Sequence, residues 1–305
     1  MRKKALILGA AGQDGFYLEK LLTEAGVEAF CAARERQGYL PCDVGDFDQV
    51  LSLVKALRPN YLFHLAAVSS ADHSALFPNE RAIVDGTMHV LEAVRQSAPL
   101  CRVFIAGSAL QFKNCGSAID ENSPLSSSSA YAAQRNASVF MARYFRESFR
   151  MPVFVGYFFH HDSPRRRTQH MAQKIATAAK NASLGLDAKL EVEDWNFKKE
   201  WTYAGDAMEA VWKIVSQDIH PEFIIGSGIP YSIKEWAQEC FSQVGKDYQN
   251  YITSRKNGPS ETITCNPALL LSCGWKARVS FSELASMMVA SDLLLGSTEQ
   301  SPKKI

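Results

Sequence analysis

The stretch that decides the fold reads Ala5-Leu6-Ile7-Leu8-Gly9-Ala10-Ala11-Gly12-Gln13-Asp14-Gly15 and continues into an amphipathic segment over residues 16–25. An apolar run, glycines spaced Gly-x-x-Gly-x-x-Gly and helical periodicity predict a strand, a tight turn and a helix. Gly9 allows the chain to turn, Gly12 allows the backbone to approach a pyrophosphate, and Gly15 allows the helix and strand to pack closely. The helix N-terminus presents free N–H groups to phosphates. We therefore expect Gly9, Gly12, Gln13, Asp14 and Gly15 to bind a dinucleotide.

The end of the second predicted strand, residues 27–33, is where such a fold distinguishes NAD from NADP. An acidic side chain there binds the ribose 2′-hydroxyl, whereas an arginine accepts a 2′-phosphate. The chain places Ala33-Arg34-Glu35-Arg36 at this point. We predict NADP, with Arg34 at the phosphate; the alternative is that Arg34 and Arg36 only solvate a loop.

The composition is that of a globular chain long enough for one or two domains, with 305 residues, 47% of them hydrophobic and 21% charged. A formal net charge of +1 gives no indication of nucleic acid or an anionic membrane as a partner. No apolar run approaches a membrane span, and the N-terminus lacks a secretory signal pattern. Seven scattered cysteines, without Cys-x-x-Cys or histidines at metal-ligand spacing, predict reduced thiols, no metal and a cytoplasmic location.

Predicted strands and helices alternate along the first half of the chain. The strands cover residues 27–33, 61–67 and 102–106, and the helices cover residues 47–57, 81–98 and 131–149. This alternation predicts an α/β fold, a Rossmann-type doubly wound parallel sheet. His64 lies on an apolar strand and is interpreted as a core histidine rather than a catalyst. Further cofactor contacts are expected from Asp43, Val44, Leu65, Ala66 and Ala67. The side chains of Ala66 and Ala67 are small enough to let the backbone come close to a cofactor.

Several segments match a known family in order and spacing. The glycine motif carries Gln13-Asp14, and Glu121-Asn122-Ser123-Pro124 precedes Tyr131. The most specific segment is Phe159-His160-His161-Asp162-Ser163-Pro164-Arg165-Arg166, which Lys199-Glu200-Trp201 and Cys273-Gly274-Trp275-Lys276 follow. On these motifs the chain resembles the extended short-chain dehydrogenase/reductases, and more narrowly the GDP-mannose 4,6-dehydratase family, over nearly its whole length.

The resemblance implies that NADP takes a hydride from C4 of the sugar, that water is lost across C5 and C6, and that the hydride returns to C6. It places Tyr131 as the base at the C4 hydroxyl and Ser108 as the residue that orients the C4 oxygen. Arg135 stands where the family has a lysine that supports the tyrosine and holds the nicotinamide ribose. A phenol of pKa about 10 is a poor base at pH 7 unless a positive charge stabilises its phenolate. We expect Tyr131, Arg135 and Ser108 to be catalytic, with Tyr131 and Arg135 also contacting the cofactor.

The chain departs from this family at several positions. Leu110 stands at the position of the family's glutamate, so the proton acceptor for the elimination is missing. Ile83 replaces a structural asparagine, His160 replaces an asparagine, and Lys199 replaces an arginine expected near the nucleotide phosphates. His160 or His161 could substitute for the glutamate, although an exposed loop histidine is more often incidental. The loop over residues 36–41 is shorter than the loop that the dehydratases use in tetramer contacts.

The second half of the chain is predicted to bind the substrate. Residues 158–305 are expected to form a smaller C-terminal α/β domain, residues 1–157 an NADP-binding domain, and residues 201–226 a segment returning to it. Because arginine pairs with phosphates in a bidentate manner, the resemblance places His160, Arg165, Arg166, Lys174 and Lys199 at the nucleotide sugar. A solvated charge run or a subunit contact is the alternative. Trp195 and Trp201 either line the cleft or serve packing, and a solvated tail is expected over residues 296–305.

Two classes of function follow. The first is an NADP-dependent enzyme that acts at C4 of a nucleotide-diphosphate sugar, expected to be GDP-linked. Dehydration is the outcome that the family implies, whereas 4-keto reduction or epimerisation fits the missing glutamate better. The second is a non-catalytic relative that binds NADP and a nucleotide sugar. We favour the enzyme, and the wider family implies a homodimer formed by the helices at residues 81–98 and 131–149.

Overall fold

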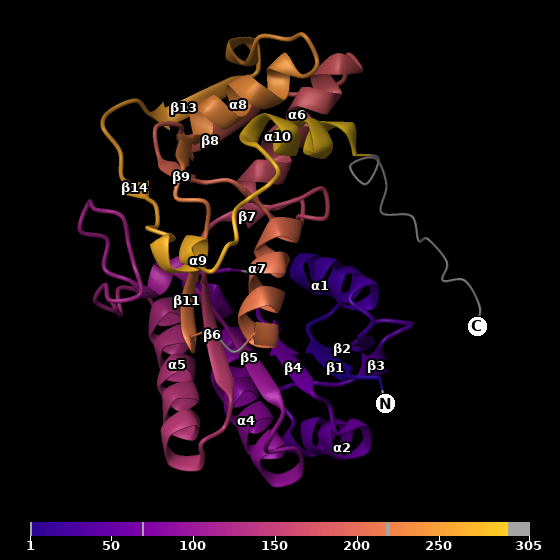
Figure 1. Cartoon of the computed structure of the whole chain (residues 1–305). Coiled ribbons are helices and arrows are strands. Elements are labelled where there is room, and N and C mark those ends of the chain that lie inside the picture. Colours follow the sequence, from indigo (N-terminus) through magenta and orange to yellow (C-terminus); the bar gives the residue numbers. More distant parts are fainter. Residues whose placement is uncertain (1, 69, 218–219, 292–305) are drawn as a thin grey trace.

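A parallel sheet forms the centre of the first of two lobes (Figure 1). The computed structural model describes residues 2–68, 70–217 and 220–291. The sheet has seven strands in the order β11-β6-β5-β4-β1-β2-β3, and all neighbouring pairs are parallel. The predicted Rossmann-type fold is confirmed. The strands are β1 (Lys4–Leu8), β2 (Glu28–Ala33), β3 (Leu40–Pro41), β4 (Tyr61–His64), β5 (Arg102–Ser108), β6 (Val153–Phe158) and β11 (Glu222–Ile225).

Helices cover both faces of this sheet because successive strand residues point to opposite sides. Leu6 and Leu8 of β1 belong to the core on one face, whereas Ala5 and Ile7 belong to the core on the other face. The helices on the Leu6 side are α2 (Phe47–Leu57), α4 (Gly86–Ser97) and α5 (Ala130–Phe149). The helices on the Ile7 side are α1 (Gln13–Glu24) and α7 (Ala204–Gln217), with the short α9 (Ala268–Ser272).

Some predicted elements have different boundaries in the structure. The predicted strand at residues 61–67 ends at His64, and residues 65–67 form a loop. The predicted helix at 81–98 is a composite of α3 (Leu76–Asn79), a π-helical turn over Glu80–Asp85, and α4. The last described helix is α10 (Phe281–Ala290). Residues 292–305, which include the predicted tail, lie outside the described residues.

The second lobe packs α6 (Met171–Ser183), α8 (Ile233–Ser242) and α10 around a tryptophan pair. Trp201 is buried, and its ring stacks on Trp236 with 4.3 Å between the ring centroids. Trp201 and the partly buried Trp195 both belong to this core and border neither cavity described below, which confirms the packing alternative.

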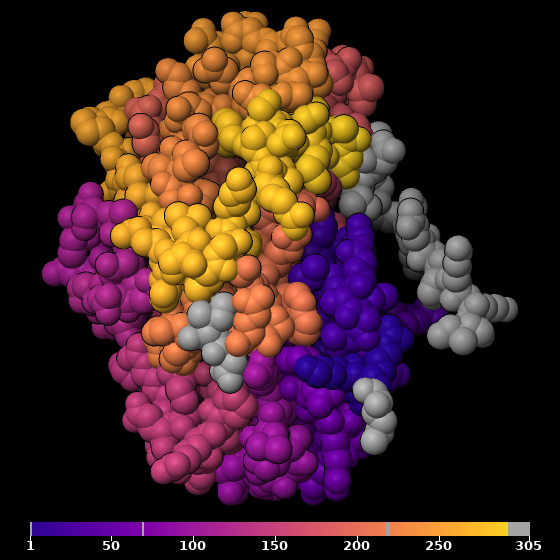
Figure 2. All heavy atoms as spheres, in the orientation of Figure 1, coloured from indigo at the N-terminus to yellow at the C-terminus, as the bar shows by residue number. Residues whose placement is uncertain are grey.

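Short strands complete the second lobe. They pair as β7 (His161–Asp162) with β10 (Thr202–Tyr203), β8 (Leu190–Asp194) with β13 (Ile252–Lys256), and β9 (Lys198–Glu200) with both β12 (Pro230–Ser232) and β14 (Thr262–Ile263). Figure 2 shows the yellow C-terminal residues covering one face from this lobe down to the first. There α9 packs against β11, so the chain crosses between the lobes more than once. The division into domains at residue 157 stays a prediction.

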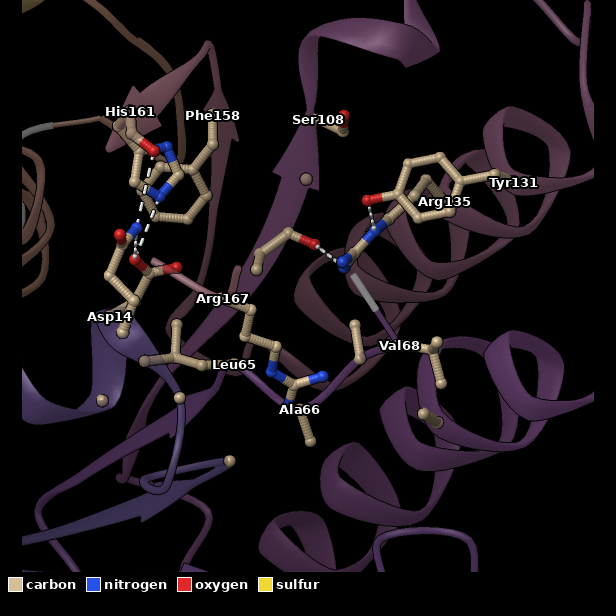
Figure 3. Close-up of a pocket in the computed structure, with 18 of the residues that line it drawn as sticks. Asp14, Leu65, Ala66, Val68, Ser108, Tyr131, Arg135, Phe158, His161 and Arg167 are labelled. Atoms are coloured by element: carbon tan, nitrogen blue, oxygen red, sulfur yellow. Dashed lines mark hydrogen bonds and ion pairs between the residues drawn. The ribbon is translucent and has the colours of Figure 1, made fainter. Parts of the chain in front are cut away.

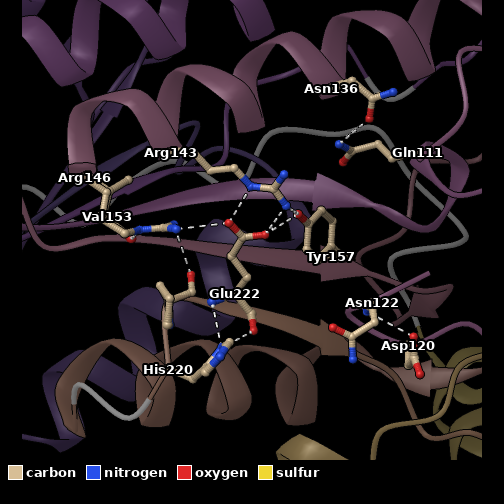
Figure 4. Close-up of polar contacts among 11 residues, drawn as sticks. Gln111, Asp120, Asn122, Asn136, Arg143, Arg146, Val153, Tyr157, His220 and Glu222 are labelled. Carbon is tan, nitrogen blue, oxygen red and sulfur yellow. Dashed lines mark hydrogen bonds and ion pairs between the residues drawn. The ribbon is translucent and has the colours of Figure 1, made fainter. Parts of the chain in front are cut away.

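The edge strand β11 is held to α5 by a charged cluster (Figure 4). The Glu222 carboxylate accepts hydrogen bonds from the Arg143 Nε and Nη2 at 2.8 and 2.7 Å, from the Arg146 Nη1 at 3.0 Å and from the Tyr157 hydroxyl at 2.7 Å. Burial alone would raise the pKa of Glu222, but these partners lower it to about 2.

None of the described helices is both long and apolar enough to cross a membrane.

Candidate active site

A cavity of about 650 Å³ opens between the two lobes at the carboxyl ends of the central strands (Figure 3). Parallel α/β sheets bind ligands at this edge. The first lobe contributes the glycine-rich turn, the end of β2, residues 65–68 and the start of α5. The second lobe contributes residues 165–167, His170, Phe197 and Lys199. Nearly all of the predicted site residues border this cavity. The exception is Lys174, which is exposed on α6 and lies outside it.

The turn after β1 has the geometry that its glycines predict. Gly9 has a φ of +87°, and a Cβ atom on it would lie 2.6 Å from the backbone nitrogen of Ala66. A Cβ atom on Gly15 would lie 2.5 Å from the Cα of Ala10, so Gly15 permits close packing of α1 against the turn itself. Gly12 is the N-cap of α1 and supplies no capping side chain. The first N–H groups of α1 can therefore bind an anion.

Charged residues surround Asp43 at the end of the cavity beside β2. The Arg81 Nη2 lies 3.0 Å from the Asp43 Oδ2, and the Gly45 backbone N–H donates to the Asp43 Oδ1 at 3.0 Å. Burial alone would raise the pKa of Asp43, but these donors, with Arg34 nearby, lower it. Arg34 borders the cavity with an exposed side chain 3.9 Å from Glu35. Arg34 is placed where it can pair with a phosphate, and its role stays a prediction.

Tyr131, Arg135 and Ser108 meet where β5 ends beside the first turns of α5. The Arg135 Nε donates to the Tyr131 hydroxyl oxygen at 3.0 Å, and the Nη1 donates to the Ala106 carbonyl at 2.5 Å (Figure 3). Arg135 is 8% exposed, so its guanidinium is fixed between α5 and the strand. Ser108 closes β5 and caps the following 3₁₀ turn, where its Oγ accepts from the Leu110 N–H. The structure thus brings the three predicted catalytic residues into one cavity.

No free carboxylate borders this cavity among the residues that the structure describes. Leu110 borders the cavity and is 41% exposed. Among the described residues that border it, the acids are Asp14 and Asp43, and both carboxylates are bound by other side chains. The group that the resemblance assigns to the C5 proton therefore has no carboxylate replacement in this part of the structure.

His64 is a core residue, as predicted. It is 3% exposed on β4 and does not border the cavity. Burial lowers its pKa to about 3, and the nearby Arg135 charge contributes. Within the described residues its Nδ1 has no hydrogen-bond partner. His64 therefore stays neutral beneath Arg135.

Contacts between distant segments hold the glycine-rich turn against the second lobe. The His161 Nε2 lies 3.0 Å from the Asp14 Oδ1, and the His161 Nδ1 lies 2.9 Å from the Phe159 carbonyl oxygen. The Ser163 hydroxyl donates to the Gln13 Oε1 at 2.8 Å. Burial alone would raise the pKa of Asp14, but His161 and Gln13 lower it to about 2. Burial alone would lower the pKa of His161, but Asp14 raises it, and the ring contacts with a carboxylate and a carbonyl favour the imidazolium form.

Cations from the second lobe lie at the other end of the cavity. Arg166 pairs with the buried Asp162 at 3.1 Å. His160 is exposed to the cavity. Lys199 on β9 is 6% exposed, and burial is the main cause that lowers its pKa to about 8. Lys199 and His160 also border a smaller adjoining cavity of about 330 Å³. Asp162, Glu193 and Asp194 also line this smaller cavity, so an anion is better placed in the main cavity beside Lys199.

The model of the GDP-mannose 4,6 dehydratase family matches residues 6–288. The chain belongs to this family. GDP-mannose 4,6 dehydratase 1 of Arabidopsis thaliana is 27% identical over 98% of this chain and 92% of its own length. The Homo sapiens GDP-mannose 4,6 dehydratase is 26% identical over 96% of this chain and 92% of its own length.

Solved structures share the fold. The UDP-glucose 4-epimerase of Thermus thermophilus, in complex with NAD, has a TM-score of 0.82, with 21% identity over 97% of this chain and 100% of that chain. RMD from Pseudomonas aeruginosa, in complex with NADPH, has a TM-score of 0.83, with 17% identity over 95% of this chain and 97% of that chain. The predicted membership of the GDP-mannose 4,6-dehydratase family is confirmed.

The structure adds residues to this family member's site that the sequence did not single out. Arg81, Phe197 and His170 border the cavity, as does Arg167, which directly follows Arg165 and Arg166 in the chain. Arg81 pairs with Asp43, which lies on a different element, so the sequence alone could not connect the two residues. Phe197 and His170 carry no motif, so only the tertiary fold identifies them. Arg167 belonged to a recognisable run, but the sequence could not tell the three arginines apart.

Proposed function

We propose that this chain is an NADP(H)-dependent enzyme that transfers a hydride at C4 of a nucleoside-diphosphate sugar, with a GDP-linked sugar as its substrate. The observation that carries this proposal is the 3.0 Å hydrogen bond from Arg135 to the Tyr131 hydroxyl, beside Ser108 in the same cavity as the glycine-rich turn. The family supplies the substrate class, since its relatives are GDP-mannose 4,6-dehydratases. The NADPH bound to RMD and the exposed Arg34 beside β2 support NADP(H).

The glycine-rich turn fits such a cofactor because any Cβ on Gly9 would meet Ala66, and the uncapped start of α1 faces the cavity. The bound cofactor supplies the hydride that reduces the C4 carbonyl carbon. Tyr131 donates its hydroxyl proton to the C4 oxygen, so that a C4 hydroxyl forms. Arg135 stabilises the resulting phenolate through its short N–H contact, and Ser108 orients the C4 oxygen.

Leu110 favours 4-keto reduction over dehydration. Elimination across C5 and C6 needs a group that removes the C5 proton, and an aliphatic side chain cannot do so. Reduction needs only a proton at the C4 oxygen, which Tyr131 provides. Epimerisation is compatible with the same residues, whereas a non-catalytic binding role is motivated by Ile83, Leu110, Arg135 and Lys199 together.

The test is a pair of incubations read by mass spectrometry. With GDP-mannose and NADP we expect no loss of water. With a GDP-linked 4-keto-6-deoxy sugar and NADPH we expect a gain of two hydrogens together with oxidation of NADPH. Tyr131→Phe should abolish the second reaction while retaining NADPH binding. Water loss from GDP-mannose would establish a dehydratase instead, and binding of both ligands without turnover would establish the non-catalytic alternative.

We also propose a homodimer formed by α4 and α5. These helices pack side by side on one face of the sheet and carry exposed apolar side chains. Phe140 and Tyr144 lie one turn apart on α5 and are 56% and 50% exposed, and Met88 on α4 is 39% exposed. Burial of this strip in a partner removes apolar surface from water. Sedimentation equilibrium tests the proposal, and a monomer at micromolar concentration contradicts it.

A cytoplasmic location is proposed from the thiols. All seven cysteines are free, and Cys42, Cys101, Cys240 and Cys265 are buried. Proteins that keep unpaired cysteines are typical of reducing compartments. Cell fractionation tests this assignment, and recovery of the protein in a secreted fraction contradicts it.

A further inference from the structure

The segment that crosses between the lobes is fixed on the start of α1. His161 binds Asp14, Ser163 binds Gln13, and the Arg165 guanidinium lies 3.9 Å from the centroid of the Phe16 ring. These partners all belong to the first turn of α1, directly after the glycine-rich turn. The crossing segment is thus held over the place where α1 presents its free N–H groups.

The three consecutive arginines in this segment have different surroundings. Arg165 stacks on Phe16, and Arg166 pairs with the buried Asp162 at 3.1 Å. The Arg167 side chain is exposed and borders the main cavity. Over the described parts of the chain, its guanidinium makes no hydrogen bond or ion pair. Arg165 thus packs on an aromatic ring and Arg166 pairs with an acid, whereas Arg167 has neither kind of partner among the described residues.

Arg167 extends into the part of the cavity next to the glycine-rich turn. Figure 3 draws its side chain together with those of Leu65, Ala66, Tyr131 and Arg135, which border the same cavity. Ala66 itself touches the turn, since a Cβ on Gly9 would lie 2.6 Å from its backbone nitrogen. The guanidinium and the N–H groups of α1 thus face the same space from opposite lobes.

We propose that Arg167 binds the diphosphate of the dinucleotide cofactor and so closes the second lobe over it. A planar guanidinium pairs with two phosphate oxygens at once, and the N-terminus of α1 binds the same group from below. The inference rests on the proposed function. It assigns Arg167 to the cofactor rather than to the nucleotide sugar, whose diphosphate would lie toward Lys199.

The shared chemistry is a diphosphate, so the experiment separates its two sources. Isothermal titration would give the Kd of NADPH, NADH and GDP for the wild-type protein and for Arg167→Gln. A charge-assisted pair lost to water should raise the Kd of NADPH about tenfold to a hundredfold. The Kd of NADH should rise by the same factor, because NADH has the same diphosphate. The Kd of GDP should be unchanged. Arg167→Lys should give intermediate values, since lysine keeps the charge without the fork.

Lys55→Gln is the matched control, because Lys55 is exposed on α2 and its change alters the net charge equally. Its NADPH affinity should equal that of the wild type. Weakened GDP binding with normal NADPH binding in Arg167→Gln would overturn the proposal in favour of the substrate. Weakened NADPH with unchanged NADH would assign Arg167 to the 2′-phosphate, and unchanged affinity for all three ligands would also overturn it. A wild-type protein that binds no dinucleotide would refute the proposed function itself.

Discussion

We predict that the affinity for the nucleotide diphosphate depends on pH because residue 199 is a lysine. An arginine at this position would give no such dependence. Its side chain is 6% exposed, and its Nζ lies 4.3 Å from the centroid of the Trp201 ring. Burial lowers its pKa from 10.5 to about 8. The Asp162 charge opposes this shift, and the Arg166 charge adds to it. Lys199 is therefore mostly charged at pH 7 and mostly neutral at pH 9.

The size of the effect follows from that pKa. The protonated fraction falls from about 0.9 at pH 7 to about 0.1 at pH 9. If only the protonated form of Lys199 binds the diphosphate, the apparent Kd rises about tenfold over this range. The reason is that the apparent Kd equals the intrinsic Kd divided by the protonated fraction. A bound phosphate raises the pKa of Lys199, so the complex keeps the proton that the free protein loses. The free protein itself becomes more stable between about pH 8 and 10.5, by up to about 3 kcal/mol, because the unfolded chain then binds more protons than the native one.

The assay is isothermal titration of GDP at pH 7, 8 and 9 with the wild-type protein and Lys199→Arg. The terminal phosphate of GDP titrates at about pH 6, so its charge is nearly constant in this window. Arginine keeps its charge throughout, and the variant should show a Kd that changes less than about twofold. A flat wild-type profile, or the same tenfold loss in the arginine variant, would refute the reasoning.

Four other changes are expected to separate stability from chemistry. Glu222→Gln should lower the free energy of unfolding in urea at pH 7 by about 3 kcal/mol; because the pKa of Glu222 is depressed to about 2, the difference should shrink as the pH falls below about 4.5. Gly9→Ala should abolish NADPH binding in titrations, since its φ is +87° and the new Cβ would meet Ala66. Leu110→Glu should produce water loss from GDP-mannose in the mass spectrum. Phe140→Asp should convert a dimer to a monomer in sedimentation, with NADPH affinity unchanged.

Local sequence predicted the parts of this structure that depend on local geometry. The run before Gly9 alternates between two buried faces of a central strand, and the left-handed φ of Gly9 follows from its place in a tight turn. The spacing of four residues between Tyr131 and Arg135 places both on one side of a helix. The end of β5 at Ser108 then brings all three residues together.

Long-range contacts could not be predicted in the same way. Gln13 and Asp14 were expected at the cofactor, yet their side chains bind residues about 150 positions later, at Ser163 and His161. Their backbone N–H groups still face the cavity, so a cofactor contact stays a prediction. Lys174 is exposed on α6 and does not border the cavity. The basic composition of its segment could not show which way α6 is turned.

Under the proposed function, the family's chemistry divides into two parts. In the proposed mechanism, hydride transfer at C4 depends on Tyr131, which matches the family, and on Arg135, which replaces the family's lysine. The placement of both residues is fixed by α5, β5 and the core between them. The resemblance assigns removal of the C5 proton to one side chain in a short 3₁₀ turn, where Leu110 is 41% exposed and outside the core. Substitution at such a position costs little stability, so the elimination can be lost or regained by one change while the redox residues stay in place. A reductase built on a dehydratase scaffold is therefore the simplest account of this chain, and Leu110→Glu tests it without disturbing Tyr131.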